Sequence, residues 1–245
     1  MHAALGTLFA LALPPRCPGC GCVTAADHRF CAGCWSSLHF IAPPWCAACN
    51  LPFDHDRGEG MVCGACIARP PRHAGVRAAV AYGPVARNVA LRLKYAGRTA
   101  FAETAARLMA RHLPGDTDLI LSVPLHRRRL WSRSYNQAAL IATALGRIGG
   151  VRSDARLLER TKPTPVLRGL NPSERRRAVR GVFGLATGGA GAVKGRAIVL
   201  ADDVYTSGAT ADACTHALLR AGAASVTILC WARVLPDGDG LSTAD

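Results

Sequence analysis

Two adjacent carboxylates, Asp202 and Asp203, stand between an apolar run and a short loop of small and hydroxyl residues. The run from Ala197 to Ala201 is typical of a strand buried on both faces of a parallel sheet. The loop holds Thr206, Ser207, Gly208, Ala209 and Thr210, and we expect a helix from Thr210 onward. Free backbone N–H groups and the positive end of a helix dipole favour an anion at such a loop. We therefore expect the loop to bind a phosphate.

The two acids predict more than a phosphate, because carboxylates repel anions. They fit a ligand that also offers hydroxyl groups or a metal ion. A phosphorylated ribose offers both when Mg²⁺ is shared with a pyrophosphate group. The ordinary alternative is a strand, an acidic turn and a Thr-capped helix. The order of apolar run, DD, TSGAT and helix favours the ligand site.

A second expected strand turns basic at its end, where His126 and Arg127 are followed by Arg133. Beside a phosphate loop, these cations are candidates to receive pyrophosphate. Ser134 and Gln137 also match the S-x-x-Q capping box of a helix, which requires no function. We favour the capping role for Gln137 and the ligand role for Arg127 and Arg133.

The stretch from Glu159 to Arg180 holds seven basic residues and three prolines. It has no apolar periodicity until Asn171, where a short helix is expected to start. Long basic loops beside active sites often close over anionic substrates, so we interpret this stretch as a lid. The alternative is an exposed loop that serves only solubility.

The first 66 residues contain four CxxC pairs, which offer two sets of four thiolates. In a reducing compartment such pairs are more often metal ligands than disulfides. Two closed Cys₄ zinc sites would let a segment with little apolar core fold. Pairing along the chain and cross-braced pairing remain open, and an iron–sulfur cluster is the rival metal centre. The expected ligands are Cys17, Cys20, Cys31, Cys34, Cys46, Cys49, Cys63 and Cys66.

Three further cysteines stand outside these pairs. Cys22 is interpreted as a surface thiol or an alternative ligand, whereas Cys214 and Cys230 lie on expected apolar faces and are assigned to the core.

The elements that position these residues divide the chain near Pro70. Residues 1–70 form the expected cysteine-rich double zinc-binding module, and residues 71–245 form a second domain. Strands are expected at 76–82, 119–123, 197–201 and 226–231. One helix is expected to begin at Pro84, with Val85, Val89 and Leu93 on one face, and others are expected around 101–109, at 134–148 and from 210 to 221. Strands that alternate with helices predict an α/β fold with a parallel sheet and right-handed crossovers.

Net charge separates the two parts further. The formal net charge is +14, yet residues 1–70 hold four basic and four acidic residues, so the whole excess belongs to residues 71–245. A basic domain favours phosphate-bearing partners, either small molecules or nucleic acid. The apolar stretch Ala3 to Leu13 is shorter than the ~20 residues that a membrane helix needs. We interpret it as a short packing helix and expect a cytoplasmic protein without membrane insertion.

The segment from Ile198 to Thr210 resembles the 5-phosphoribosyl-1-diphosphate (PRPP) signature of type I phosphoribosyltransferases. The resemblance implies a type I phosphoribosyltransferase-like sheet flanked by helices. It also implies that Asp202 and Asp203 meet the ribose hydroxyls, with Mg²⁺ bound alongside PRPP, while residues 206–210 hold the 5′-phosphate.

Further segments occur in the same order in the ComF family of competence-associated proteins, many of which carry an N-terminal double zinc ribbon. These segments are LRLKYAGR from Leu91, SVPLHRRRLWSRSYNQ from Ser122, RTKPTP and RRRAVRGVF. They add Lys94 and Asn136 to the pyrophosphate or lid candidates. The sequence departs from the family at Ser134, where Gly is usual, at Ala178, where Asn is usual, and at Val166 and Leu167, where many members have Gln.

The family resemblance implies a role in DNA uptake during natural transformation or in DNA utilisation. Three functions fit: a phosphoribosyltransferase with an unknown acceptor, a non-catalytic protein that binds single-stranded DNA and serves the DNA-uptake machinery, and a PRPP sensor without turnover. No catalytic base is evident in the sequence, so enzymatic activity stays open.

Overall fold

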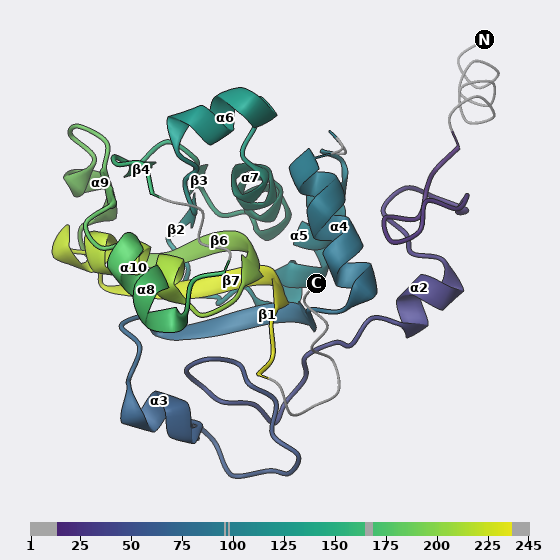
Figure 1. The fold of residues 1–245 in the computed structure, drawn as a ribbon, viewed down its shortest axis with the longest axis horizontal. Helices are drawn as coiled ribbons and strands as arrows, with labels where there is room; N and C mark the ends of the chain where they lie inside the picture. Colours follow the sequence, from purple (N-terminus) through teal and green to yellow (C-terminus); the bar gives the residue numbers. More distant parts are fainter. Residues whose placement is uncertain (1–13, 96, 98, 165–168, 237–245) are drawn as a thin grey trace.

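A five-stranded parallel sheet forms the centre of the protein in a computed structural model, which describes residues 14–95, 97, 99–164 and 169–236. The strand order is β1-β7-β6-β2-β3, and every neighbouring pair is parallel (Figure 1). The strands are β1 (Gly75–Ala81), β2 (Leu119–Ser122), β3 (Ser153–Asp154), β6 (Ala197–Tyr205) and β7 (Ser225–Arg233). The expected α/β fold is therefore confirmed.

Helices cover both faces of this sheet. One face carries α4 (Pro84–Tyr95), α5 (Phe101–Met109), the short η1 (Ala110–His112) and α7 (Gln137–Gly149). The other face carries α10 (Ala209–Arg220) and α9 (Ala190–Val193). Side chains alternate along β6, since Val199 and Ala201 enter the first core and Ile198 and Leu200 enter the second. This double burial explains why the strand has no polar residue before Asp202.

The segment expected to be a lid is built on a small antiparallel hairpin. β4 (Leu158–Arg160) pairs with β5 (Phe183–Leu185), and the helix α8 (Pro172–Ala178) lies in the connection between them. The short helix expected to start at Asn171 is confirmed, and Asn171 caps it through a full capping box with Glu174. The hairpin strands were not expected, because three-residue strands are too short to show a periodic pattern.

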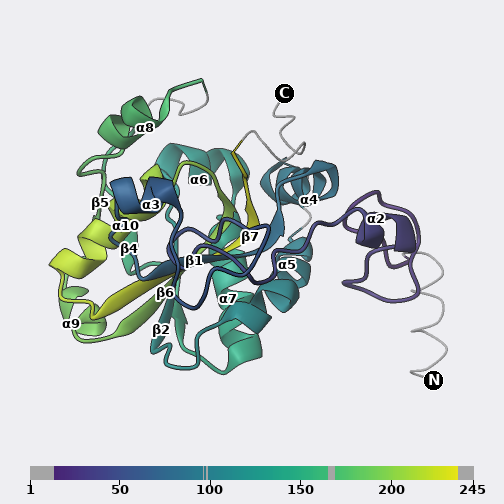
Figure 2. The ribbon, with the colours of Figure 1, turned by 90° about the horizontal axis from the view of Figure 1, so that it is seen from below.

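The two cysteine clusters lie on different sides of the sheet domain. The first, with helix α2 (Ala32–Ser36), lies beside α4, and the second, with helix α3 (Gly64–Ala68), lies on the side of α10 (Figures 1 and 2). Phe30 stacks on the buried Trp231 with ring centroids 6.3 Å apart. Asn50 is fully buried and accepts a hydrogen bond from the Ala78 N–H of β1 at 2.7 Å. Both clusters therefore pack directly against the sheet domain.

Several boundaries differ from the sequence-based expectations. The helix expected at 134–148 begins at Gln137, and a separate helix, α6 (Arg127–Arg133), precedes it. The expected S-x-x-Q capping box is wrong: Ser134 lies outside the helix with φ 64°, and the Asn136 side chain caps α7 instead. The short helix expected at 3–13 lies outside the described residues. Within the described part of the chain, no helix is both long and apolar enough to cross a membrane.

Candidate functional site

The two acids lie within strand β6 and do not follow it as expected. β6 continues to Tyr205, because its pairing with β7 runs on through the partners Tyr205 and Arg233. Successive strand residues point to opposite faces, so the two carboxylates separate. Asp203 faces α4, where its Oδ2 lies 2.6 Å from the Lys94 Nζ, and Asp202 faces the loop that leads into α10.

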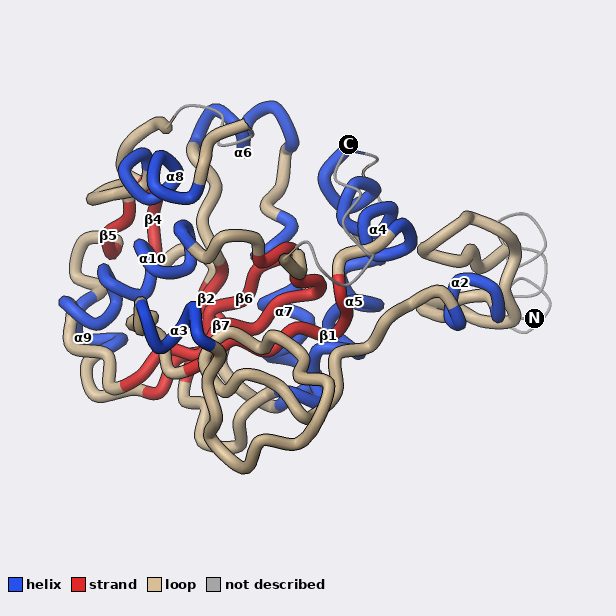
Figure 3. Tube along the Cα trace, turned by 60° about the horizontal axis from the view of Figure 1, so that its bottom comes forward, coloured by secondary structure: helices blue, strands red, loops and turns tan. Residues whose placement is uncertain are grey.

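That loop closes a cavity of about 310 Å³. The loop connects the end of β6 to α10, and both elements can be followed in the trace of Figure 3. Helix α10 begins one residue earlier than expected, at Ala209, and no side chain caps its N-terminus. Its first N–H groups are therefore free for a ligand, as in other anion sites at helix N-termini. The cavity is lined by Arg175, Asp202, Val204, Tyr205, Thr206, Ser207, Gly208, Ala209, Thr210 and Ala211. Six of the seven residues expected to hold the phosphoribosyl group thus share one cavity.

Gly208 is required by local geometry. Its backbone has φ 74°, a left-handed conformation that side chains with a Cβ rarely adopt. A Cβ at this position would also collide with the phenol ring of Tyr205, which lines the same cavity.

Electrostatics distinguish the two acids further. The pKa of Asp202 is raised well above its ordinary value, first by burial and then by the neighbouring Asp203 carboxylate. Burial acts to lower the pKa of Lys94, but the Asp203 carboxylate outweighs it and the pKa is raised. Asp203 is therefore held by a nearby cation, whereas Asp202 is available to a ligand hydroxyl or cation in the cavity.

The remaining pyrophosphate candidates are dispersed. His126 caps α6 by accepting a hydrogen bond from the Arg128 N–H at 3.3 Å, and Arg127 is exposed at the start of that helix. Arg133 lies over the ring of Tyr95 at 4.9 Å and donates to the side chain of Gln137 at 3.3 Å. Asn136 caps α7 and donates to the Val123 carbonyl at 3.0 Å. These contacts give His126 and Asn136 structural roles.

One arginine of the expected lid lines the cavity, and a second, Arg160, lies in strand β4 of the lid hairpin. Arg175 of α8 lines the cavity, and its Nε donates to the Leu170 carbonyl at 2.8 Å. The Nε of Arg160 is buried without a partner among the described residues. The pKa of Arg160 is lowered, first by burial and then by the charge of Arg129 on α6. An anion between α6 and the lid hairpin would relieve this repulsion.

The second cysteine cluster fits a closed zinc site. The sulfurs of Cys46, Cys49, Cys63 and Cys66 all lie within 4.8 Å of one another. A tetrahedral ion with Zn–S bonds of ~2.3 Å needs sulfurs about 3.8 Å apart, and the Cys49 and Cys63 sulfurs are 3.7 Å apart. Backbone N–H groups of Cys49 and Cys63 donate to the Cys46 sulfur. Pairing therefore runs along the chain and is not cross-braced. A closed thiolate site of this kind supplies folding energy and no open coordination position.

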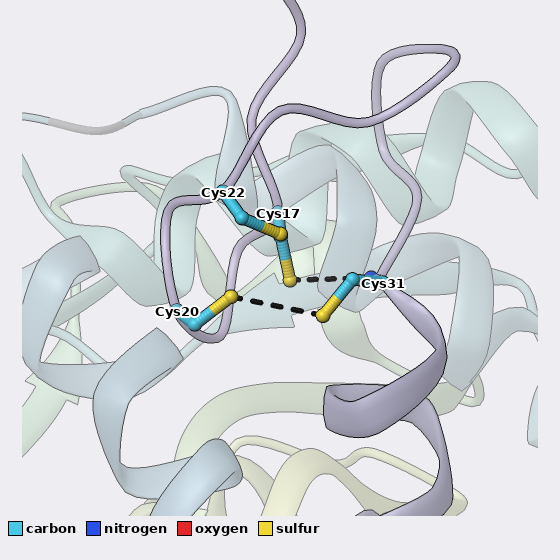
Figure 4. A group of neighbouring side chains, drawn as sticks. All are labelled: Cys17, Cys20, Cys22 and Cys31. Carbon is cyan, nitrogen blue, oxygen red and sulfur yellow. Dashed lines mark hydrogen bonds between the residues drawn. The ribbon is translucent and has the colours of Figure 1, made fainter.

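The first cluster gathers five cysteines around one site. Cys17, Cys20, Cys22 and Cys31 have sulfurs within 4.8 Å of one another (Figure 4). Burial and the neighbouring thiols of Cys20 and Cys31 raise the pKa of Cys34, which places this fifth thiol against the same group. The sequence assigned Cys34 to the set and left Cys22 as an alternative ligand, whereas the four sulfurs within 4.8 Å of one another include Cys22 and not Cys34. The separation of the Cys20 and Cys31 sulfurs, 3.7 Å, again fits zinc. Cys214 and Cys230 are fully buried, as expected of core residues.

Comparisons with known proteins agree with this arrangement. Residues 8–67 match the model of the double zinc ribbon domain family. The chain is 32% identical over 92% of its length to the DNA utilization protein YhgH of Escherichia coli O6:H1, and it covers all of that protein. It is 26% identical over 87% of its length to competence protein F of Haemophilus influenzae, of which it covers 94%.

Solved structures with a similar shape include two proteins that act on phosphoribosyl compounds by name. One is a glutamine PRPP amidotransferase from B. subtilis, at 16% identity and a TM-score of 0.36, covering 52% of this chain and 25% of that one. Another is a hypoxanthine phosphoribosyltransferase from Staphylococcus aureus, at 10% identity and a TM-score of 0.33, covering 59% and 79%.

Proposed function

The chain belongs to the ComF family, which includes competence protein F and the DNA utilization protein YhgH, and from this premise we propose that it binds PRPP with Mg²⁺. One observation carries the proposal: Asp202 and the uncapped N-terminus of α10 line the same cavity. The free N–H groups of the loop would take the 5′-phosphate. The Asp202 carboxylate would accept from the ribose hydroxyls, and Mg²⁺ would balance the charge of the diphosphate.

The diphosphate would lie toward the lid and α6. Arg160 and Arg129 are close enough for the charge of Arg129 to lower the pKa of Arg160, so both gain from an anion between them. Arg175 reaches the cavity from α8. Arg129, Arg160 and Arg175 support this position for the diphosphate. Arg127 and Arg133 would not support it by themselves, because Arg133 is already hydrogen-bonded to Tyr95 and Gln137. Lys94 would act indirectly, by holding Asp203.

Turnover and sensing make different demands on this site. A phosphoribosyltransferase must stabilise the departing pyrophosphate, which Arg160 and Arg175 could do by neutralising its charge. A sensor needs only saturable binding. The names of the relatives favour a role in DNA utilisation or competence, and we place that role in the cytoplasm. Release of pyrophosphate that depends on Mg²⁺ would favour the enzyme.

The test is calorimetric titration of PRPP with Mg²⁺ into the zinc-loaded chain and into Asp202→Asn. We expect saturable binding in the wild type and a loss of at least about tenfold in the variant, since one charge-assisted hydrogen bond contributes roughly 1.5–3 kcal/mol. The matched control is Asp116→Asn, which removes the same charge from an exposed loop. Equal affinity in Asp202→Asn and the control would contradict the proposal, as would a folded wild type that does not bind.

A further inference from the structure

A second hollow, of about 1140 Å³, lies beside the phosphate-loop cavity and is formed by three separate parts of the chain. They are the connector that follows the second cysteine cluster, the end of the lid from α8 to β5, and the outer face of α10. We call it the arginine groove. Six arginines line it, against one acidic side chain, Asp212. They are Arg69 and Arg72 from the connector, Arg176, Arg177 and Arg180 from the lid, and Arg220 from α10.

The charge of the arginine groove is not neutralised by the protein. Across the described residues, none of the six arginines forms an ion pair within 4.0 Å. Arg72 instead contacts the ring of His216 on α10. The pKa of His216 is lowered by burial and by Arg72, Arg220 and Arg180, so positive charge is concentrated here. Binding of an external anion would therefore neutralise positive charge that the described part of the protein leaves unpaired in this groove.

We propose that the arginine groove binds the phosphate backbone of a single nucleic-acid strand. Guanidinium groups match phosphate oxygens in a bidentate geometry, and six of them along a groove suit a chain of phosphates better than one phosphate. The volume exceeds the ~300–1,000 Å³ of sites for small ligands. Phe183 is the one Phe, Tyr or Trp side chain in the lining, and the ring of His216 is in contact with Arg72, so an anchored protein partner and base-specific stacking are both disfavoured.

The position of the groove favours a single strand over a duplex. Ala209 lines both the groove and the loop cavity, and α8 contributes Arg175 to the cavity and Arg176 to the groove. The groove therefore adjoins the loop cavity, and a strand whose end entered that cavity would have to be unpaired there. The proposal goes beyond PRPP binding and does not depend on it.

The groove also gives the zinc ribbon a part in binding. Arg69 directly follows α3, which carries Cys66 of the second cysteine cluster. Arg72 lies next to His73, which is buried and faces Asp212 of α10 with its Nε2 3.8 Å from the carboxylate. The ordered second cluster thus holds the connector against α10, and binding should require arginines from both parts of the chain.

Fluorescence anisotropy with 3′-labelled oligo(dT) of about 20 nucleotides, longer than the ~4–16 of typical single-strand sites, tests the proposal over a salt series. Two groove variants are compared, Arg69→Gln/Arg72→Gln and Arg176→Gln/Arg220→Gln. The control, Arg107→Gln/Arg152→Gln, removes the same charge from exposed positions outside the groove. We expect each groove variant to lose about tenfold or more in affinity. The magnitude of the slope of log K against log salt should fall by about 1.4, because each variant loses two phosphate contacts that contribute ~0.7 each. The affinity of the control should stay within about twofold of the wild-type value.

Groove variants that bind the strand as the control does would overturn the proposal. A competition experiment gives a second test. If poly-glutamate displaced the labelled strand as well as unlabelled oligo(dT) does, the proposal would also be overturned, because the groove would then suit an acidic protein. The two groove variants alter different elements, so one remains informative if the other fails to fold. PRPP titration of the same samples separates this result from failure of the phosphoribosyl site, since the variants should keep PRPP affinity.

Discussion

At the scale of single residues, neighbouring side chains of identical type have different environments. Asp202 faces a cavity and Asp203 faces Lys94, although they are adjacent in the chain. Likewise five cysteines of the first cluster compete for the four positions of a tetrahedral ion. In both cases residue type indicates the chemistry and the three-dimensional surroundings assign the part that each residue plays.

The Lys94–Asp203 pair should show its role in stability. Both side chains are largely buried, so removing one partner leaves the other charge poorly solvated. We expect Asp203→Asn to lower the free energy of unfolding by about 2 kcal/mol, less than a fully buried pair would lose because Lys94 is partly exposed. The double variant Lys94→Met/Asp203→Asn should recover most of the loss in urea unfolding. Additive losses would show that the two side chains are not coupled.

The five-cysteine cluster predicts a specific zinc stoichiometry. Cys22→Ser and Cys34→Ser should each retain two zinc ions per chain, because either remaining thiol completes the first site. The double variant should hold one, as should Cys49→Ser, whose cluster has no spare thiol in the described chain. Metal analysis after gel filtration measures this. Loss of zinc in only one of the two single variants would identify an obligatory ligand.

At the scale of elements, helix ends decide where the site residues point. Helix α6 was missed because RRRLWSR has no apolar face, and its Trp131 is 88% exposed. It begins at the His126 cap and ends at Ser134 in the left-handed region. The turn at Ser134 separates α6 from α7 in a left-handed conformation, which Gly adopts more readily than Ser.

Ser134→Gly should therefore stabilise the protein. A residue with a Cβ costs roughly 1–2 kcal/mol in the left-handed conformation, and part of that gain is offset by the greater chain entropy of unfolded Gly. We expect about 1 kcal/mol of added stability in chemical denaturation. Ser134→Ala, which keeps the Cβ, is the matched control and should show no gain. A destabilised glycine variant would mean that the serine side chain makes a contact that outweighs this strain.

At the scale of the whole molecule, the cysteine module is packed into the sheet domain. Arg233 at the end of β7 is buried and donates to the carbonyl and sulfur of Cys49. Arg77 of β1 donates to the Ala47 carbonyl at 3.0 Å. These contacts couple the second cluster to the strands that carry the core, although the compositional boundary near Pro70 predicts two separate units. The division at residues 70 and 71 stays a prediction.

His73, at this junction, makes stability depend on pH. Burial lowers its pKa to about 4, from an ordinary value near 6.5. The unfolded chain therefore binds more protons between these values, so stability is full above pH 6.5 and is lost as pH falls toward 4. From pH 7.5 to 5.5 we expect His73→Gln to lose about 1 kcal/mol less than the wild type in urea unfolding. Exposed His55→Gln is the control. Parallel pH profiles for all three proteins would contradict the prediction.

The sequence by itself determined the features that lie within short segments. The loop between β6 and α10, the CxxC pairs and the buried central strands each depend on neighbouring residues, so their patterns are readable before folding. Only the tertiary structure decided what distant segments build together. Packing of the chain brings Lys94 to Asp203, Arg175 to the loop cavity, and the arginines of connector, lid and α10 into one groove. Such long-range contacts follow from how the elements pack in three dimensions, which no local pattern encodes.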